Sequence, residues 1–195
     1  RFLVGLSIDG PRELHDRFRI TKQGAPTFDG VMAAVELLRQ YDVPFNTLTS
    51  VHRFNATRPL DVYRFLRREV GSTYMQFIPI VQARGFETSA PGALRSLQLP
   101  MPGAPRALPG HPASVVTEWS VDPEDYGRFL CAIWDQWRSN DLGSVLVNFA
   151  ETLVAQHLGL PSQLCVHSEI CGKGVAVEHD GAVYACDHYV YPEYR

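Results

Sequence analysis

The sequence contains no apolar run approaching the roughly 18 residues of a membrane-spanning helix, so we exclude a transmembrane protein. Positive charge is not in excess, since 18 Lys and Arg face 21 Asp and Glu, a formal net charge of −3. This balance argues against a nucleic-acid module, which needs a basic field. Four cysteines in 195 residues are too few for a disulfide scaffold. The hydrophobic fraction, 45%, excludes intrinsic disorder.

The first residues lack the features of a natural beginning. Residue 1 is Arg rather than Met, and the apolar run over residues 2–8 predicts a strand almost from the start. No positively charged segment precedes an apolar stretch, as it would in a signal peptide. We therefore interpret the chain as an internal fragment of a longer protein and expect a cytoplasmic location.

Strand and helix patterns alternate along the first 80 residues. Strands are predicted at 2–8, 45–51 and 74–80, and helices at 28–41, capped by Thr27, and 59–70, opened by Pro59. The first strand is apolar enough to be covered on both faces. Short connections in a β-α-β-α-β order predict parallel strands and an α/β fold, either part of a (βα) barrel or a doubly wound sheet. No glycine fingerprint follows the first strand, which disfavours a dinucleotide-binding domain.

The second half begins with a different composition. Residues 83–115 hold six of the fourteen prolines and four glycines, which is typical of a surface loop or insertion, or of a lid facing a substrate. A helix is then predicted over 122–137, capped by Asp122 with Pro123 following. A strand at 145–148 and a helix at 149–158 complete the pattern. Cys131 lies within the predicted helix and is expected in the core.

Three of the four cysteines follow in the pattern Cys165-x5-Cys171-x14-Cys186. Three such thiols suit buried packing, a disulfide with one spare thiol, or ligation of zinc or an iron–sulfur cluster. A closed metal site needs a fourth ligand, for which the nearby nitrogen donors are His167, His179 and His188.

A hairpin is predicted between the last two of these cysteines. The dipeptide at 180–181, Asp-Gly, is flanked by alternating residues and indicates a two-residue turn. That turn sets Val177 opposite Tyr184 and directs Cys186 toward the loop that carries the preceding cysteine. Asp187 would then point to the opposite face of the strand.

Several segments together resemble the anaerobic sulfatase-maturating enzymes, which are radical S-adenosylmethionine (SAM) proteins with a SPASM iron–sulfur extension. The cysteine spacing with its Cys-Asp pair is the most specific part, and the proline-rich loop is not covered. The segments are Gly5-Leu6-Ser7-Ile8-Asp9-Gly10-Pro11, His15 with Arg19, Phe45-Asn46-Thr47-Leu48, Gln76-Phe77-Ile78-Pro79-Ile80 and Val183-Tyr184-Ala185-Cys186-Asp187-His188-Tyr189-Val190.

The resemblance implies a fold and a reaction. Residues 1–160 would form part of a partial (βα)6 barrel, with 83–115 as a loop, and residues 161–195 the start of a SPASM domain. The implied activity is that of an oxidoreductase that converts a cysteine or serine of a sulfatase to Cα-formylglycine. It implies SAM and [4Fe–4S] clusters as cofactors, the sulfatase polypeptide as substrate, and an electron donor such as flavodoxin or ferredoxin.

The resemblance also assigns roles to single residues. Ser7, Arg19 and Val81 match positions that contact SAM. Three cysteines match ligands of the first auxiliary cluster, and Asp187 matches the base that deprotonates the substrate. Without the resemblance, Ser7 would be a small core hydroxyl, Arg19 a surface charge and Asp187 a turn residue. The three matching cysteines are Cys165, Cys171 and Cys186.

The chain departs from the family pattern because the Cys-x3-Cys-x2-Cys motif and the remaining cluster ligands are absent from residues 1–195. The fragment alone is therefore expected to be inactive. Three alternatives stay open: a SPASM enzyme that modifies another peptide, a non-catalytic cysteine-rich metal-binding module, and a metal-free α/β domain with three buried thiols.

Overall fold

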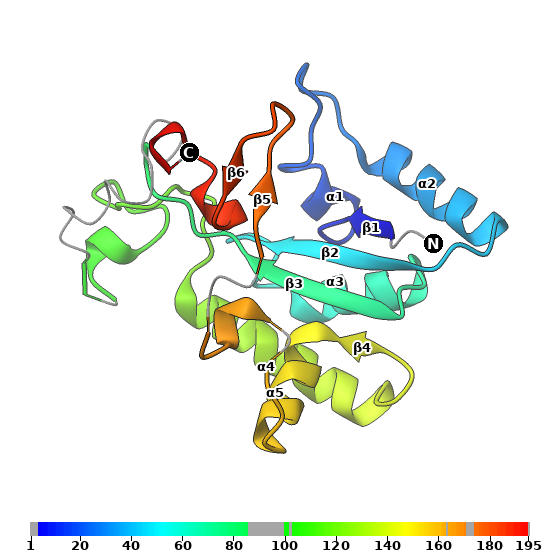
Figure 1. Ribbon diagram of the computed structural model, residues 1–195. Helices are drawn as coiled ribbons and strands as arrows, with labels where there is room; N and C mark the ends of the chain where they lie inside the picture. The colour runs from blue at the N-terminus through cyan, green and yellow to red at the C-terminus, as the bar shows by residue number, and fades with distance from the viewer. Residues whose placement is uncertain (1–3, 86–99, 102, 163, 171–173, 195) are drawn as a thin grey trace.

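The protein is an α/β structure with a four-stranded sheet and a separate C-terminal hairpin (Figure 1). The computed structural model describes residues 4–85, 100–101, 103–162, 164–170 and 174–194. The strands of the sheet are β1 (Val4–Ser7), β2 (Phe45–Val51), β3 (Tyr74–Pro79) and β4 (Leu146–Val147). They lie in chain order and every neighbouring pair is parallel, which confirms the predicted parallel arrangement.

Helices lie between these strands and after the last of them, as the alternating patterns predict. They are α1 (Arg12–His15), α2 (Phe28–Gln40), α3 (Pro59–Arg68), α4 (Pro123–Asn140) and α5 (Asn148–His157). Short 3₁₀ helices, η2 (Pro105–Ala107), η3 (Cys165–His167), η4 (Asp187–Tyr189) and η5 (Pro192–Tyr194), lie in the loops. In Figure 1, α3 and α4 lie on one side of β2 and β3, and the C-terminal hairpin lies on the other.

The N-cap of α4 acts as the sequence predicts, whereas the N-cap of α2 does not. Asp122 caps α4 as expected, because its carboxylate accepts the backbone N–H groups of Glu124 and Asp125. Thr27 occupies the N-cap position of α2, but its side chain makes no capping bond. Asp16 instead accepts the N–H groups of Thr27 and Phe28 at 3.0 and 2.9 Å. The expected role of Thr27 is therefore wrong, because a carboxylate from an earlier turn takes its place.

One hydrophobic core lies between the sheet and the helices. Strand residues point into it, including Val51, Met75 and Val147, and so does Ile8 directly after β1; all four are 0% exposed. The opposite face of β1 is open, with Gly5 and Ser7 exposed. The expectation that this strand is covered on both faces is therefore wrong for the described residues, since its neighbours pack on one side only.

Cys131 is also placed differently from the prediction. It lies on α4 but is exposed, whereas Phe129, Ile133 and Trp137 of the same helix are buried. These three positions form the buried face of the helix, and residue 131 lies on the opposite face.

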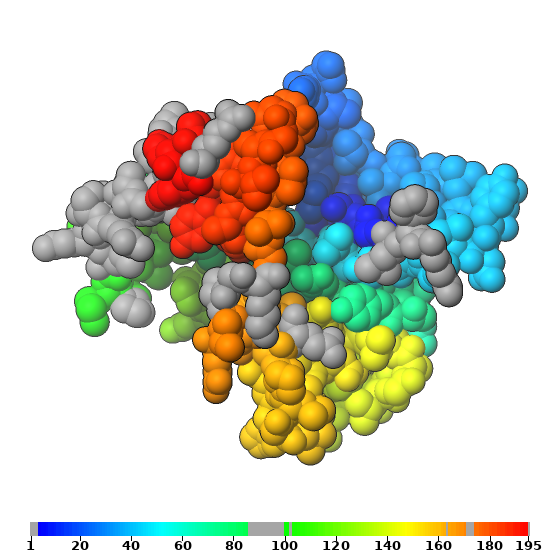
Figure 2. Space-filling model, viewed as in Figure 1, coloured from blue at the N-terminus to red at the C-terminus, as the bar shows by residue number. Residues whose placement is uncertain are grey.

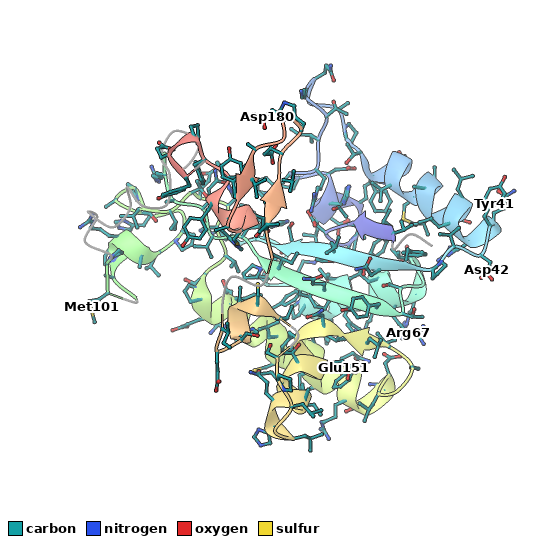
Figure 3. The ribbon with its side chains drawn as sticks, viewed as in Figure 1. Tyr41, Asp42, Arg67, Met101, Glu151 and Asp180 are labelled. Atoms are coloured by element: carbon teal, nitrogen blue, oxygen red, sulfur yellow. The ribbon has the colours of Figure 1, made fainter. Side chains whose placement is uncertain are left out.

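The C-terminal hairpin consists of β5 (Ala176–Val177) and β6 (Val183–Tyr184). Val177 pairs with Val183, and Glu178 N–H donates to the Ala182 carbonyl, so the loop contains three residues, 179–181. Gly181 has a φ of +82°, as the last residue of such a loop requires. The predicted two-residue turn is thus wrong by one position, and the strand register shifts with it. Figure 3 labels Asp180 at the tip of this hairpin.

In the space-filling view the hairpin and the η4 region (orange to red) lie against one another as one continuous mass (Figure 2). None of the helices in the described residues combines the length and the apolar character that crossing a bilayer requires.

Candidate functional site

The carboxyl ends of β1, β2 and β3 meet at one edge of the sheet, where functional residues of parallel α/β folds gather. Ser7 is the last residue of β1 and is exposed on the open face of the sheet. It pairs in register with Leu48 of β2, which in turn pairs with Gln76 of β3. The hydroxyl of Ser7 therefore borders the open face at this edge, rather than packing in the core.

Asp9, two residues beyond Ser7, lies within this edge with its side chain 2% exposed. Its Oδ1 accepts the backbone N–H of Ser50 at 2.8 Å, so the carboxylate bridges the ends of β1 and β2. The amide of Asn55 donates to the carbonyls of Asp9 and Ser50, at 3.0 and 2.9 Å. Gly10 follows with a φ of +127°, which L side chains rarely adopt, so the chain can turn sharply after Asp9.

Arg19 folds back onto this edge from the loop after α1. Its Nε and Nη2 donate to the two carboxylate oxygens of Asp9, at 2.7 and 3.1 Å, and Nη2 also donates to Ser50 Oγ at 2.9 Å. Its side chain is 33% exposed. The alternative of a solvated surface charge is therefore wrong for Arg19, which is held by a buried carboxylate.

A second chain of bonds fixes the backbone of the same loop. The buried His15 ring accepts the N–H of Asp9 at Nδ1 and lies 3.1 Å from Thr27 Oγ1 at Nε2. Thr27 Oγ1 in turn donates to the Arg19 carbonyl at 2.5 Å. Burial lowers the pKa of His15, which favours the neutral ring that this pattern needs.

His52 is a further buried histidine at the end of β2, with 2% of its surface exposed. Its Nδ1 accepts the backbone N–H groups of Phe54 and Asn55, and Phe18 packs edge-on against the ring. Burial lowers the pKa of His52 to about 4. The ring is therefore neutral at physiological pH and holds the turn that carries Asn55.

Val81 follows β3 and is 67% exposed. The flanking residues are tied down, since Ile80 N–H donates to the Val51 carbonyl and Gln82 N–H to Ser120 Oγ. The three residues assigned to SAM contact thus all lie at the carboxyl edge, on β1, on the loop after α1 and after β3.

The C-terminal candidates are arranged differently. Sγ of Cys186 donates to Asp187 Oδ1 at 3.1 Å and lies 3.3 Å from His188 Nδ1. These three side chains are the described group whose possible metal-ligand atoms all lie within 4.8 Å of one another. The expectation that the thiol and the carboxylate face opposite ways is wrong, because the strand ends at Tyr184 and residues 187–189 turn into η4. The thiol hydrogen bond lowers the pKa of Asp187 most, and His188 lowers it further.

Of the other two predicted ligands, the structure describes only Cys165, and it does not join this group. Cys165 is exposed in η3 and is not a member of the group around Cys186. Cys171 lies outside the described residues. The donors suit an iron–sulfur cluster in kind, because accessible sulfur atoms are present and the His188 N–H donates to Cys186 Sγ at 3.4 Å, as donors near cluster sulfurs do. The described residues alone do not assemble the cluster site.

Comparison with known proteins gives matches along the whole chain. These matches are to individual proteins and structures, since no family model matches the chain. The serine-type anaerobic sulfatase-maturating enzyme of Bacteroides thetaiotaomicron is 38% identical over 194 residues, which cover 100% of this chain and 44% of that protein. The resemblance to anaerobic sulfatase-maturating enzymes is confirmed. The cysteine-type enzyme of Clostridium novyi is 30% identical over 197 residues, covering 100% of this chain and 45% of the relative.

Solved structures of a sulfatase-maturating enzyme agree with these sequence matches. The structure described as histidine-tagged anSMEcpe with bound AdoMet aligns with a TM-score of 0.76 and 30% identity, covering 100% of this chain and 44% of that one. Another is described as native anSMEcpe with bound AdoMet and the Cp18Cys peptide, with a TM-score of 0.70 and 29% identity, covering 100% of this chain and 47% of that one. The chain therefore spans less than half the length of the relatives it matches.

Sequence reasoning missed two residues of the carboxyl edge. From the sequence, Asp9 is expected only to shape its turn, and Ser50 has no assigned role. A carboxylate directly after a buried parallel strand, followed ten residues later by an arginine, is the signal that could have identified the Asp9–Arg19 pair.

Proposed function

We propose that the chain is part of a radical SAM oxidoreductase that matures sulfatases by converting a cysteine or serine side chain to Cα-formylglycine. The observation that carries this proposal is the match of the entire chain, at 38% identity, to a serine-type sulfatase-maturating enzyme. Because the chain spans 44% of that relative, the activity belongs to the longer protein, and the chain alone is proposed to be inactive.

SAM would bind at the carboxyl edge of the sheet. Ser7 offers an exposed hydroxyl and Arg19 offers the guanidinium N–H groups that Asp9 and Ser50 leave unused. Val81 offers an exposed apolar side chain on the loop after β3. The matched structures described as holding AdoMet support this assignment.

The C-terminal segment would act on the substrate side chain. Cys165, Cys171 and Cys186 would hold an auxiliary [4Fe–4S] cluster, which would accept an electron from the substrate during its oxidation. Asp187 would accept the proton of the substrate hydroxyl or thiol. A ligating thiolate has no proton to donate, so metal binding at Cys186 would release Asp187 from the thiol hydrogen bond seen here.

The overall reaction removes two electrons and two protons from the substrate. A serine loses one hydrogen atom from Cβ, its hydroxyl proton and one further electron, which gives the aldehyde. A cysteine loses the corresponding hydrogen atom, proton and electron, and water then replaces the sulfur, which leaves as hydrogen sulfide. Only the proton from oxygen or sulfur is assigned to a residue of this chain, Asp187.

The remaining parts of the proposal concern the longer protein. Residues 1–160 would belong to a partial (βα)6 barrel, with 83–115 as a loop on it, and residues 161–195 to the start of a SPASM domain. The four parallel strands and the structural match to anSMEcpe support the first part. The partners would be a sulfatase polypeptide and an electron donor such as flavodoxin or ferredoxin, in the cytoplasm.

The direct test uses the full-length protein that contains this chain, reconstituted with iron and sulfide without oxygen. It is given SAM, a reductant and two peptides that carry either cysteine or serine at the sulfatase target position. We expect an aldehyde at that position, detected by mass spectrometry and by hydrazide labelling. SAM cleavage with no aldehyde on either peptide would favour an enzyme that modifies another peptide.

A second test addresses the metal. Cys186→Ala should lower the iron bound per full-length chain, whereas Cys131→Ala, an exposed cysteine on α4, should leave it unchanged. Equal iron in both variants would contradict the ligand assignment. Colourless protein with stoichiometric zinc would favour the non-catalytic metal-binding module.

A further inference from the structure

Arg19 has unused hydrogen-bonding capacity that is held in a fixed orientation. A guanidinium carries five N–H donors, and three of them are used here: Nε and one Nη2 donor on Asp9, and the other Nη2 donor on Ser50. Nη1 makes no hydrogen bond to the described residues, and the Arg19 side chain is 33% exposed. The two N–H groups of Nη1 are therefore available to an acceptor at the carboxyl edge.

The partner that orients this group is itself immobilised. Asp9 is almost fully buried and accepts the Ser50 N–H, while Asn55 clamps the carbonyls of both residues. His15 and Thr27 hold the backbone at Asp9 and at Arg19. The plane of the guanidinium is thus set by the ends of β1 and β2 rather than by the flexible arginine side chain.

We propose that Asp9 is a positioning residue for ligand binding, which holds Arg19 so that Nη1 faces the carboxylate and hydroxyl oxygens of SAM. This proposal rests on the proposed function, because that assigns SAM to the carboxyl edge. Ser50 assists by accepting the second Nη2 donor. Asp9 acts through Arg19 and does not touch the ligand.

Asp9→Asn isolates this role because it preserves size while removing one acceptor. Oδ1 accepts two bonds, from Ser50 N and Arg19 Nη2, and Oδ2 accepts one from Arg19 Nε. If the asparagine oxygen takes the place of Oδ1, its NH₂ group faces the N–H donor of Arg19 Nε. In the reverse orientation the NH₂ group faces two donors, the Ser50 N–H and Arg19 Nη2. Either orientation turns the guanidinium away from its present plane.

The experiment measures SAM binding directly, by anaerobic equilibrium dialysis of the full-length protein with labelled SAM. Loss of hydrogen bonds to a charged group predicts that Asp9→Asn weakens SAM binding by roughly tenfold or more. Turnover at saturating SAM should change much less, so the effect falls on KM rather than kcat. Ser50→Ala should give a smaller loss in the same direction.

The matched control is the other partly buried Asp–Arg pair. Asp141 accepts Arg67 Nε and Tyr63 Oη, both at 2.9 Å, and it lies between α4 and β4, before the amino end of that strand. Asp141→Asn should lower the thermal stability without changing the dissociation constant for SAM. This separates a general loss of stability from a specific loss of ligand binding.

A double-mutant cycle decides whether Asp9 acts through Arg19. In an Arg19→Ala background, Asp9→Asn should cause no further loss of SAM affinity. An undiminished loss there, or wild-type affinity in Asp9→Asn, would overturn the proposal. If Asp9→Asn does not fold, Ser50→Ala carries the test, and unchanged SAM affinity in that variant would overturn it.

Failure of the proposed function gives a different pattern. A wild-type protein that binds SAM but forms no formylglycine contradicts the maturase assignment, while a weakened Asp9→Asn still supports the positioning role. A reconstituted wild-type protein that binds no SAM overturns both.

Discussion

The sheet region, which is the described part of residues 4–160, and the C-terminal segment, which is the described part of residues 164–194, are held together by different means. Helices α1 to α5 and all four strands contribute to one hydrophobic core. In the C-terminal segment the strands are two residues long, and the described buried apolar side chains are Ala182 and Tyr184. Its exposed apolar residues include Val166, Ile170, Val175, Val177 and Val183.

This difference indicates where each half of the candidate chemistry obtains its geometry. At the carboxyl edge, Asp9 and Arg19 are oriented by strand pairing and buried hydrogen bonds within the chain. Around Cys186, the thiol contacts to Asp187 and His188 join residues that are next to one another in the chain. We therefore expect substitutions in the sheet region to change stability most, and substitutions around Cys186 to change chemistry with little effect on stability.

The largest effect is expected from Asp187→Asn. The variant should lower formylglycine production in the full-length enzyme by about 10²- to 10⁴-fold, because a general base contributes that much. SAM cleavage should continue, since Asp187 is assigned to the substrate proton and not to SAM contact. Product is measured by mass spectrometry and 5′-deoxyadenosine by chromatography.

Glu193→Gln, an exposed carboxylate in η5, is the control for this prediction and should keep the wild-type yield. Equal formylglycine yields from Asp187→Asn and the wild type would remove the base assignment. A lower melting temperature in Asp187→Asn would instead weaken the contrast between the two regions.

Next in size is the contrast in stability between a core and a hairpin residue. Phe129 is 0% exposed and stacks edge-on with Phe77, so Phe129→Ala should cost about 3–5 kcal/mol of unfolding free energy. Val177 is 64% exposed, and Val177→Ala should stay within about 0.5 kcal/mol. Denaturant titration followed by tryptophan fluorescence measures both, and similar losses would show that the hairpin is packed as firmly as the sheet.

The smallest expected effect is a pH dependence from His52. Its pKa is about 4 in the folded state against 6.5 for the ordinary value, so the unfolded chain takes up the proton first as pH falls. Stability is therefore fully present above pH 6.5 and declines by about 3 kcal/mol as pH approaches 4.

His52→Asn tests this effect, because its amide oxygen can replace Nδ1 as the acceptor for the N–H groups of Phe54 and Asn55. The variant should show a flatter dependence of the denaturant midpoint on pH between about 6.5 and 5. A slope as steep as that of the wild type would assign the acid sensitivity to other groups, among them His15.

The sequence predicted the sheet region well because its signals are local. Periodic apolar positions, Pro59, and Asp122 with Pro123 define α3 and α4, and helix starts such as these depend on neighbouring residues. The cap of α2 was mistaken because Asp16 reaches it from eleven residues away, which no local pattern records. Cys131 was mistaken because its helical neighbours are apolar, although its own side of α4 is exposed.

The candidate site was less predictable from local pattern. The positions of Ser7 and Val81 follow from the ends of predicted parallel strands, but the Asp9–Arg19–Ser50 contacts join residues as far as 41 positions apart. The hairpin register depended on a choice between a two- and a three-residue loop, and Gly181 is compatible with either. The expected direction of Asp187 depended instead on the strand continuing to residue 187, whereas β6 ends at Tyr184 and the chain turns into η4.

The bridge that Asp9 makes to the backbone of Ser50 would couple the proposed recognition of SAM to the alignment of the first two strands. Sliding β1 by one residue against β2 would carry the carboxylate to the other side of the sheet and take the guanidinium with it. The affinity for SAM at this edge would then depend on strand alignment. A titration with SAM would therefore serve as a folding probe for the amino-terminal half of the described chain.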